Sequence, residues 1–203
     1  MKVLIFGTKQ IAQLAHFYFT TDSDFEVIGF CVDAAYKTED SFCGLPVFTV
    51  EELKFDPQGV QFFVAIADND LRAEKYKMLK DKGYQLCSYI SSKAVCLTEV
   101  IGDNCFILES NVIQPFVSIG NNVILWSGNH IGHHSQIEDH VFVSSHVVIC
   151  GNCKIGAYSW LGVNSSVRDG IELADRTTVC MDTMVRRGTK SGQKIFGVPG
   201  KGI

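Results

Sequence analysis

Aliphatic residues recur at every sixth position over nearly half of this chain. Every one of these positions holds isoleucine, leucine or valine, and they are Val95, Ile101, Ile107, Ile113, Ile119, Leu125, Ile131, Ile137, Val143, Ile149, Ile155, Leu161, Val167, Leu173, Val179 and Val185. A period of six fits neither the 3.6-residue turn of an α-helix nor the simple alternation of a strand. It is typical of a hexapeptide solenoid, in which short strands wind into a prism and stack. Residues 91–188 are therefore predicted to form an all-β parallel β-helix.

Two further features of the repeat support a tightly wound prism. The residue two places before an aliphatic position is also expected to point inward, and many of these residues are small: Cys105, Ser135, Cys153, Ser159, Ser165, Thr177 and Thr183. Glycine follows the aliphatic residue at Gly102, Gly120, Gly132, Gly156 and Gly162, where we expect the chain to turn a corner. Residues 189–203 are glycine-rich and are expected to leave the prism as a C-terminal tail.

The first 90 residues lack the six-residue period. Their apolar runs predict strands over 2–6, 26–33, 61–67 and 84–89, and their charged and amphipathic stretches predict helices over about 10–19 and 70–82. Strands that alternate with helices indicate a small parallel, Rossmann-like α/β sheet. In such sheets ligands bind at the carboxyl ends of the strands. The residues at these ends are Gly7, Thr8, Lys9, Gln10, Asp33, Asp68 and Asn69.

Composition and charge exclude several classes of function. A net charge of −4 gives no electrostatic reason to expect a nucleic acid partner. No apolar run approaches the roughly 20 residues that a membrane-spanning helix needs, so membrane insertion is not expected. The apolar N-terminus lacks the small-residue cleavage site of a signal peptide. A cytoplasmic location is the resulting expectation.

Eight cysteines raise the question of disulfides or zinc. Cys150 and Cys153 form a C-x-x-C pair, but the repeat register directs Cys153 inward and Cys150 outward. Free cysteine is a good small core residue. We therefore expect ordinary thiols and no metal site, with zinc or redox chemistry as the lesser alternative.

Histidine is concentrated in one part of the prism. Of the six histidines, five lie within residues 130–146: His130, His133, His134, His140 and His146. His133 and His134 follow the inward Ile131 by two and three places, which predicts that they face outward at a corner. A neutral imidazole there can take a proton from an amine or a hydroxyl as it attacks a thioester. The alternative is a polar corner whose histidines only form hydrogen bonds.

The order of the two domains, the segment SGNHIGHHS at residues 127–135 and the segment FGVPGK at residues 196–201 resemble the bacterial sugar acetyltransferases of the bacillosamine, perosamine and sialic acid type. The resemblance implies a left-handed β-helix that assembles as a homotrimer. It also implies that acetyl-CoA lies between neighbouring subunits and that the N-terminal domain holds a nucleotide-linked amino sugar. The catalytic histidine of the family falls on His133.

The chain departs from this family in four places. The acidic residue after the catalytic histidine is replaced by His134, which leaves Glu138 or Asp139 as substitutes, or His134 itself as the base. Trp126 replaces a polar residue of the sugar pocket. A second histidine that contacts the thioester falls on Phe142, although His146 lies close by in the sequence. The glycine-rich first turn is reduced to Gly7, so a G-x-G-x-x-G dinucleotide motif is absent.

The resemblance also implies contacts to coenzyme A. Gly151, Gly162 and Val163 are the candidates for main-chain contacts, while Arg186, Arg187 and Lys201 are candidates for the phosphates. Corner geometry alone is the alternative explanation for the glycines, and capping of a helix or strand end is the alternative for Asp33, Asp68 and Asn69.

The resulting hypothesis is an acetyl-CoA-dependent N-acetyltransferase with a histidine general base and direct attack. Its substrate would be a nucleotide-linked amino-deoxy sugar of surface polysaccharide or glycan biosynthesis. Acetylation of a sugar hydroxyl is the first alternative, and a non-catalytic protein that binds a nucleotide sugar is the second.

Overall fold

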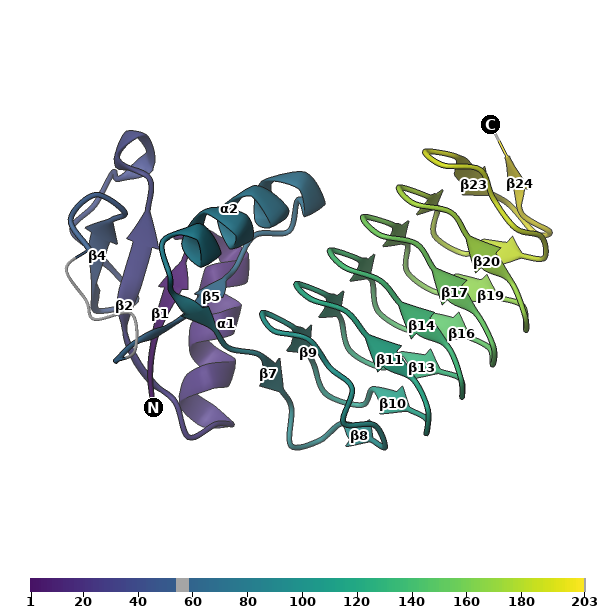
Figure 1. The fold of residues 1–203 in the computed structure, drawn as a ribbon, viewed down its shortest axis with the longest axis horizontal. Coiled ribbons are helices and arrows are strands. Elements are labelled where there is room, and N and C mark those ends of the chain that lie inside the picture. The colour runs from purple at the N-terminus through teal and green to yellow at the C-terminus, as the bar shows by residue number, and fades with distance from the viewer. Residues whose placement is uncertain (54–58, 203) are drawn as a thin grey trace. The chain divides into compact units, whose positions relative to one another are not determined.

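The structure is a computed structural model that describes residues 1–53 and 59–202. The chain divides into two compact units, Met1–Tyr89 and Ile90–Ile203 (Figure 1). Each unit has its own hydrophobic core. The units are therefore described in turn.

The first unit is an α/β fold built on a six-stranded sheet. Its elements are β1 (Lys2–Phe6), α1 (Gln10–Thr21), β2 (Glu26–Val32), the 3-10 helix η1 (Ala34–Tyr36), β3 (Ser41–Phe42), β4 (Leu45–Thr49), β5 (Gln61–Val64), α2 (Asn69–Asp81) and β6 (Gln85–Leu86). The strand order is β3-β4-β2-β1-β5-β6, and only β3 runs antiparallel to its neighbour. The predicted parallel sheet is confirmed, and its central strand β1 is fully buried from Val3 to Ile5.

Two details of this unit differ from the sequence expectation. The hairpin of β3 and β4 was not expected, because its short strands carry no regular apolar pattern. The strand expected over 84–89 is only Gln85–Leu86, and Tyr89–Ile90 forms β7, which belongs to a sheet of the second unit.

The second unit is a parallel β-helix with three sheets. The largest contains β7, β9 (Phe106–Ile107), β12 (Ile124–Leu125), β15 (Phe142–Val143), β18 (Trp160–Leu161), β21 (Thr178–Val179), β23 (Lys194–Phe196) and β24 (Lys201–Gly202). The second contains β8 (Val95–Cys96), β10 (Val112–Ile113), β13 (His130–Ile131), β16 (Val148–Ile149), β19 (Ser166–Val167) and β22 (Met184–Val185). The third contains β11 (Ser118–Ile119), β14 (Gln136–Ile137), β17 (Lys154–Ile155) and β20 (Glu172–Leu173).

The six-residue repeat fills the inside of this prism. Phe142 pairs with Ile124 on one side and with Trp160 on the other, so the chain returns to the same sheet after three hexads. From Ile107 to Val185 every aliphatic position of the repeat is 3% exposed or less. The small residues two places earlier are buried beside them, as predicted. The coils stack on one another (Figure 1). Their inward side chains form one continuous aliphatic core.

The series of inward aliphatic positions begins one hexad later than the sequence period indicates. Val95 is 51% exposed. The first coil is one residue short, because Val95 pairs with the outward Val112 and Cys96 pairs with the inward Ile113. A slip of one residue moves a side chain to the opposite face of a strand. Cys96 therefore occupies the inward place, and it packs against the core together with Ala94.

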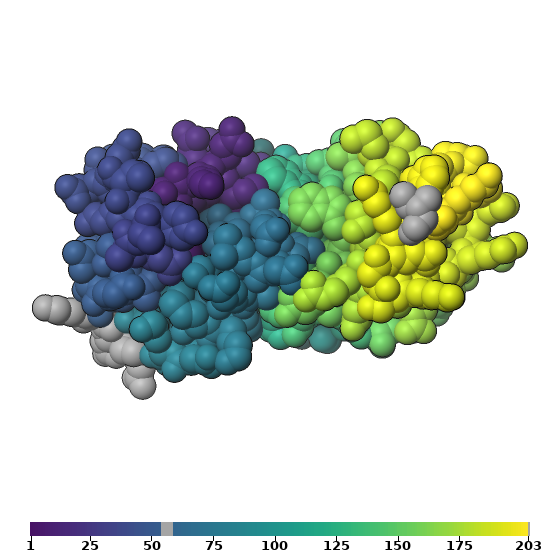
Figure 2. All heavy atoms as spheres, turned by 90° about the horizontal axis from the view of Figure 1, so that it is seen from above, coloured from purple at the N-terminus to yellow at the C-terminus, as the bar shows by residue number. Residues whose placement is uncertain are grey.

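The segment expected to leave the prism stays on it in part. Strand β23 pairs in parallel with β21, and Ile195 joins the core at 6% exposure. Strand β24 then turns back antiparallel to β23. Figure 2 shows these C-terminal residues in yellow against the green coils of the same unit.

From residue 104 to residue 182, each corner of the prism contains a residue in the left-handed backbone region. These residues also follow one another at intervals of six: Asn104, Ser110, Phe116, Asn122, Gly128, His134, His140, His146, Asn152, Tyr158, Asn164, Gly170, Arg176 and Asp182. Asparagine, aspartate and histidine tolerate this conformation better than most residues. The corners therefore form three columns, and we name the column of Phe116, His134, Asn152 and Gly170 the histidine-pair column.

The glycines that follow the aliphatic positions were expected to allow the chain to turn a corner, but they are required for a different reason. Gly132, Gly156 and Gly162 do not have left-handed backbones. A Cβ atom on Gly132 would lie 2.5 Å from the carbonyl carbon of Cys150, one coil further on. Close approach of successive coils, and not the corner dihedral, therefore requires glycine there.

Candidate active site

His133 and His134 form a pair of facing imidazoles on the outside of the prism. They follow β13 and Gly132 at the histidine-pair column, and both are exposed. Their Nδ1 atoms are 3.1 Å apart, and the ring planes are inclined at 85°. One of the two Nδ1 atoms must therefore donate a hydrogen bond to the other.

Residues of the two adjacent coils fix this pair. The backbone N–H of His133 donates to Oε1 of Gln114 at 2.8 Å. The ring of His134 packs on Phe116, with 4.7 Å between the ring centroids. On the other side, a Cβ atom on Gly151 would lie 2.7 Å from Cε1 and 2.9 Å from Nε2 of His133. Gly151, one of the predicted coenzyme A contacts, thus leaves room for the His133 ring.

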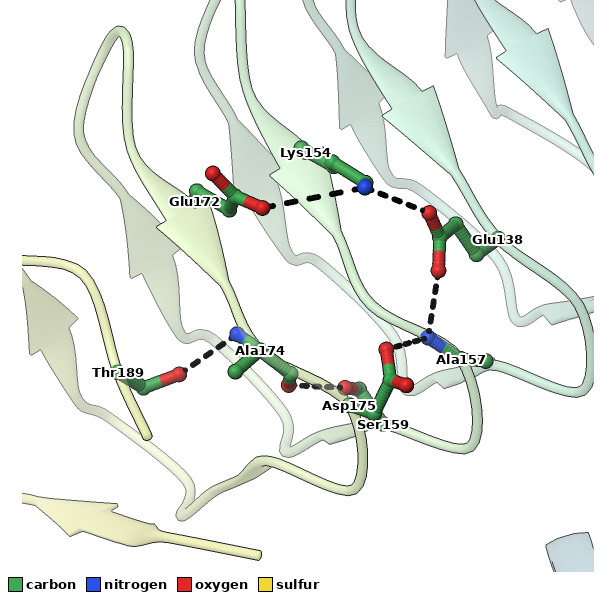
Figure 3. Close-up of polar contacts among 8 residues, drawn as sticks. All are labelled: Glu138, Lys154, Ala157, Ser159, Glu172, Ala174, Asp175 and Thr189. Atoms are coloured by element: carbon green, nitrogen blue, oxygen red, sulfur yellow. Dashed lines mark hydrogen bonds and ion pairs between the residues drawn. The ribbon is translucent and has the colours of Figure 1, made fainter. Parts of the chain in front are cut away.

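The two carboxylates proposed as substitutes for the missing acid are engaged elsewhere. Glu138 lies 2.9 Å from Nζ of Lys154 and accepts a hydrogen bond from the Ala157 N–H (Figure 3). Asp139 accepts from the backbone N–H of Asn121 at 2.7 Å. Both interactions belong to the corner before His140. Of the three candidates Glu138, Asp139 and His134, it is His134 that contacts the His133 ring.

The other histidines of the cluster lie elsewhere: His130 belongs to strand β13, and His140 and His146 lie at other corners. His140 is 2.8 Å from the Asn122 side chain and packs its ring on Tyr158. The ring of His146 lies over Gly128, where a Cβ atom would be 2.7 Å from its Nδ1. The structure thus brings together His133, His134 and Gly151, and it places His146 in a different column.

Three further residues were predicted to contact coenzyme A, and they lie outside the histidine-pair column: Gly162, Val163 and Phe142. Gly162 and Val163 precede Asn164, in the column of His146, and Val163 is 39% exposed. Phe142 is 4% exposed and stacks in parallel on Trp160, with ring centroids 3.8 Å apart. Trp126 lies 6.4 Å from Phe142 by ring centroids. Phe142 therefore packs between Trp160 of β18, on which it stacks, and Trp126, which follows β12.

The first unit presents a polar cavity at the ends of its strands. This cavity has a volume of about 140 Å³ and is lined by Thr8, Tyr36, Lys37, Thr38, Glu39, Phe42 and Val47. Gly7 precedes it with φ at +127°, so the glycine of the first turn has a backbone that other residues rarely adopt. Thr8 was predicted here. The residues after η1 and in the hairpin were missed, because nothing in their sequence pattern marked them.

The acidic and amide residues predicted near this end of the sheet have structural partners. Asp33 forms an ion pair with Lys75 of α2 at 3.0 Å. Asp68 caps α2 by accepting from the Leu71 N–H at 2.8 Å. Asn69 accepts from Arg72, which is fully buried and also donates to the carbonyls of Ile66 and Ala67. Arg72 thus holds the loop between β5 and α2, a function that the sequence did not reveal.

The thiols of this chain are free, and several are poor nucleophiles. Burial raises the pKa of Cys31 and of Cys87 to about 12. Burial also raises the pKa of Cys153, the inward member of the C-x-x-C pair. Within residues 1–53 and 59–202, no three His, Cys, Asp or Glu side chains gather as they would around a metal ion. No helix of this described part is long and apolar enough to cross a membrane.

Comparisons with known proteins match both units. Residues 2–79 match the PglD N-terminal domain, and residues 100–133 and 116–151 match the bacterial transferase hexapeptide with its six repeats. The acetyltransferase domain of PglB from Neisseria gonorrhoeae is 19% identical with a TM-score of 0.86, and the match covers 100% of this chain and 99% of that one. PerB from Caulobacter crescentus, solved with CoA and GDP-perosamine, is 22% identical with a TM-score of 0.87, covering 100% and 97%.

A third structure extends the same result. WeeI from Acinetobacter baumannii is 19% identical with a TM-score of 0.85, and the match covers 100% of both chains. At these identities the likeness establishes a shared fold, the α/β domain followed by a left-handed β-helix. The two domain matches assign residues 2–79 to a PglD N-terminal domain and residues 100–151 to bacterial transferase hexapeptide repeats, which indicates an acyltransferase.

Proposed function

We propose that this acyltransferase moves an acetyl group from acetyl-CoA to the amine of a nucleotide-linked amino-deoxy sugar, in surface polysaccharide or glycan biosynthesis. One observation carries the proposal: an exposed imidazole, His133, stands at a corner of the prism with a second imidazole and a glycine against it. Two of the similar structures contain CoA together with GDP-perosamine, an amino sugar linked to a nucleotide.

The proposed reaction needs a base but no enzyme nucleophile. The sugar nitrogen attacks the thioester carbonyl, while Nε2 of His133 takes a proton from that nitrogen. The carbon–sulfur bond then breaks, and the thiolate of coenzyme A receives the proton from His133. The backbone N–H of Gly151, beside the His133 ring, is the proposed donor to the oxyanion.

The first unit is proposed to hold the nucleotide part of the substrate. The cavity at its strand ends offers the hydroxyls of Thr8 and Thr38 and the ammonium of Lys37. Gly7, Thr8, Lys9 and Gln10 form the turn from β1 into α1, where backbone N–H groups favour a phosphate. Asp33, Asp68 and Asn69 have structural partners already, so we assign them to shaping this end of the sheet.

We also propose the assembly and the location that the family resemblance implied. A homotrimer would cover the exposed His133 with a neighbouring subunit and would complete a groove for acetyl-CoA. Gly162, Val163 and His146, at another corner, are the proposed contacts on the facing side of that groove. Arg186, Arg187 and Lys201 are exposed and are the proposed partners of the phosphates. The cytoplasm, where acetyl-CoA is available, is the proposed location.

A thiol-release assay tests the function. Acetyl-CoA is offered with UDP-, dTDP- and GDP-linked 4-amino-6-deoxy sugars, to the wild type and to His133→Ala. Release of coenzyme A with one amino sugar, reduced about 10²-fold or more in His133→Ala, is the expected result. His140→Gly, which removes a histidine from another corner, should remain active. Release with the matching 4-hydroxy sugars of the same nucleotides, and with none of the amino sugars, would replace the proposal by O-acetylation. Binding of acetyl-CoA without any release would indicate the non-catalytic alternative.

A further inference from the structure

We infer that His134 is a positioning residue, which holds the His133 imidazole in the tautomer that leaves Nε2 free to act as a base. The inference rests on the proposed function, because it needs His133 to be the base. The observation that supports it directly is the 3.1 Å distance between the two Nδ1 atoms. Each neutral imidazole carries one proton, on Nδ1 or on Nε2. The contact therefore couples the two rings.

Only one of the two arrangements allows proton abstraction by His133. If His134 donates from its Nδ1, His133 accepts at Nδ1 and carries its proton on Nε2, where it cannot act as a base. If His133 donates from its Nδ1, its Nε2 holds a lone pair. His134 then accepts at Nδ1 and carries its own proton on Nε2. In this arrangement His134 cannot be the base, so the two candidate roles exclude each other.

The surroundings of the pair hold His134 in place and carry no charge. Its ring packs on Phe116, and its backbone has the left-handed φ of 58° that the corner requires. The groups around His133 are the side chain of Gln114, the backbone of Gly151 and the N–H of Asn152, which donates to the His133 carbonyl. None of these neighbours titrates. The Nδ1 proton of His133 is thus accepted by a neutral group, His134. A carboxylate at the same place would be a negatively charged acceptor.

The proton balance of the reaction fits this arrangement. His133 takes the proton of the attacking amine on Nε2 and becomes an imidazolium. Its Nδ1 proton stays in the hydrogen bond to His134, which becomes charge-assisted and stronger. The Nε2 proton then passes to the departing thiolate, and the pair returns to its neutral state. His134 gains and loses no proton at any step.

The choice of variants keeps the corner folded. His134→Gly removes the acceptor, and glycine is already present in the same column at Gly170, also with a positive φ. His134→Asp supplies a carboxylate acceptor in the left-handed region, which Asp182 already occupies. His140→Gly makes the same substitution at the next corner and serves as the matched control. Melting temperatures show whether each protein is folded.

Two readouts separate a positioning role from a structural one. In steady-state assays with the amino sugar that the wild type uses, His134→Gly should lose about tenfold or more in kcat, within the range of general base effects. Its KM for acetyl-CoA should stay within about twofold. His134→Asp should recover kcat, and the acid limb of its pH profile should move to higher pH, because a carboxylate stabilises the imidazolium.

Nitrogen-15 NMR of the imidazoles, without substrate, supplies the second readout. The wild type should show His133 protonated on Nδ1, and His134→Gly should show it protonated on Nε2, the form that an isolated side chain prefers. Unchanged kcat in His134→Gly, or a wild-type His133 already protonated on Nε2, would overturn the inference while leaving the proposed function intact. Absence of turnover by the wild type with every sugar would instead overturn the proposed function, and the NMR would still decide the hydrogen bond.

Discussion

Gly151 lies directly against the ring of His133, which belongs to the preceding coil of the prism. A Cβ atom on Gly151 would lie 2.7 Å from Cε1 of the His133 ring, closer than van der Waals contact allows. The backbone of Gly151 is not in the left-handed region, so alanine is conformationally allowed there. Only the histidine ring has to move, and it can rotate outward.

Gly151→Ala should therefore reduce activity without unfolding the protein. We expect a loss of about tenfold or more in kcat, since a displaced base no longer meets the attacking amine. The melting temperature should stay within a few degrees of the wild type. A variant with full activity would show that His133 acts from another position or not at all. The measurement is the thiol-release assay beside a thermal melt.

Gly132→Ala should have the opposite effect. Its Cβ atom would lie 2.5 Å from the carbonyl carbon of Cys150 and 2.5 Å from the backbone nitrogen of Gly151. Backbone atoms cannot rotate away, so the coils must separate, and overpacking of this kind costs about 1–3 kcal/mol. Denaturant unfolding should show this loss of stability. A stable Gly132→Ala protein would contradict the close approach of these coils.

Substitutions of Asp68 can distinguish a helix-capping role of its side chain from a substrate-binding role. Its side chain accepts from the Leu71 N–H, and loss of such a cap costs about 1 kcal/mol. Asp68→Ala should therefore lower the free energy of unfolding by this amount, and Asp68→Ser should restore most of it. The KM for the sugar nucleotide should change little in both. A KM that rises strongly in Asp68→Ser as well would assign the carboxylate to the substrate.

Alkaline pH should destabilise the first unit through Cys31. Burial raises the pKa of this thiol from 9.0 to about 12. Because the unfolded chain loses the proton first, the stability that Cys31 contributes is complete below about pH 9 and is lost as pH rises towards 12. The slope is at most about 1.4 kcal/mol per pH unit for one thiol.

The Cys31→Ala variant isolates this contribution. Unfolding free energies of the wild type and the variant, measured at several pH values between about 8 and 11, should converge as pH rises. Cys43→Ala alters an exposed thiol and should run parallel to the wild type. Parallel curves for Cys31→Ala as well would rule out a buried, protonated thiol.

The sequence predicted the prism because burial leaves little choice of residue. Positions from Ile107 to Val185 point into a narrow core that only aliphatic side chains fill, so the period is visible. Val95 misled the prediction because valine suits both an inward and an outward place on a strand. Only the pairing of Cys96 with Ile113 reveals the shorter first coil.

The candidate site was predicted in part. The position of His133 followed from its distance to Ile131, but the contact between two nitrogen atoms depends on ring rotations that no spacing encodes. A signal for the corners was present: asparagine, histidine and aspartate recur at intervals of six from Asn104 to Asp182. It was weaker than the aliphatic signal because phenylalanine, tyrosine and arginine also occupy corners. Arg72 and the residues after η1 had no periodic signal.

The histidine pair depends on three successive coils, since Gln114 and Phe116 support it from one side and Gly151 makes room for it on the other. Exchange of a single repeat between related solenoids would thus transfer the imidazoles without their supports. The smallest segment that could carry this arrangement into another protein runs from Gln114 to Asn152. Inheritance of the site is therefore tied to a block of coils, even though the fold itself can grow or shrink by one coil at a time.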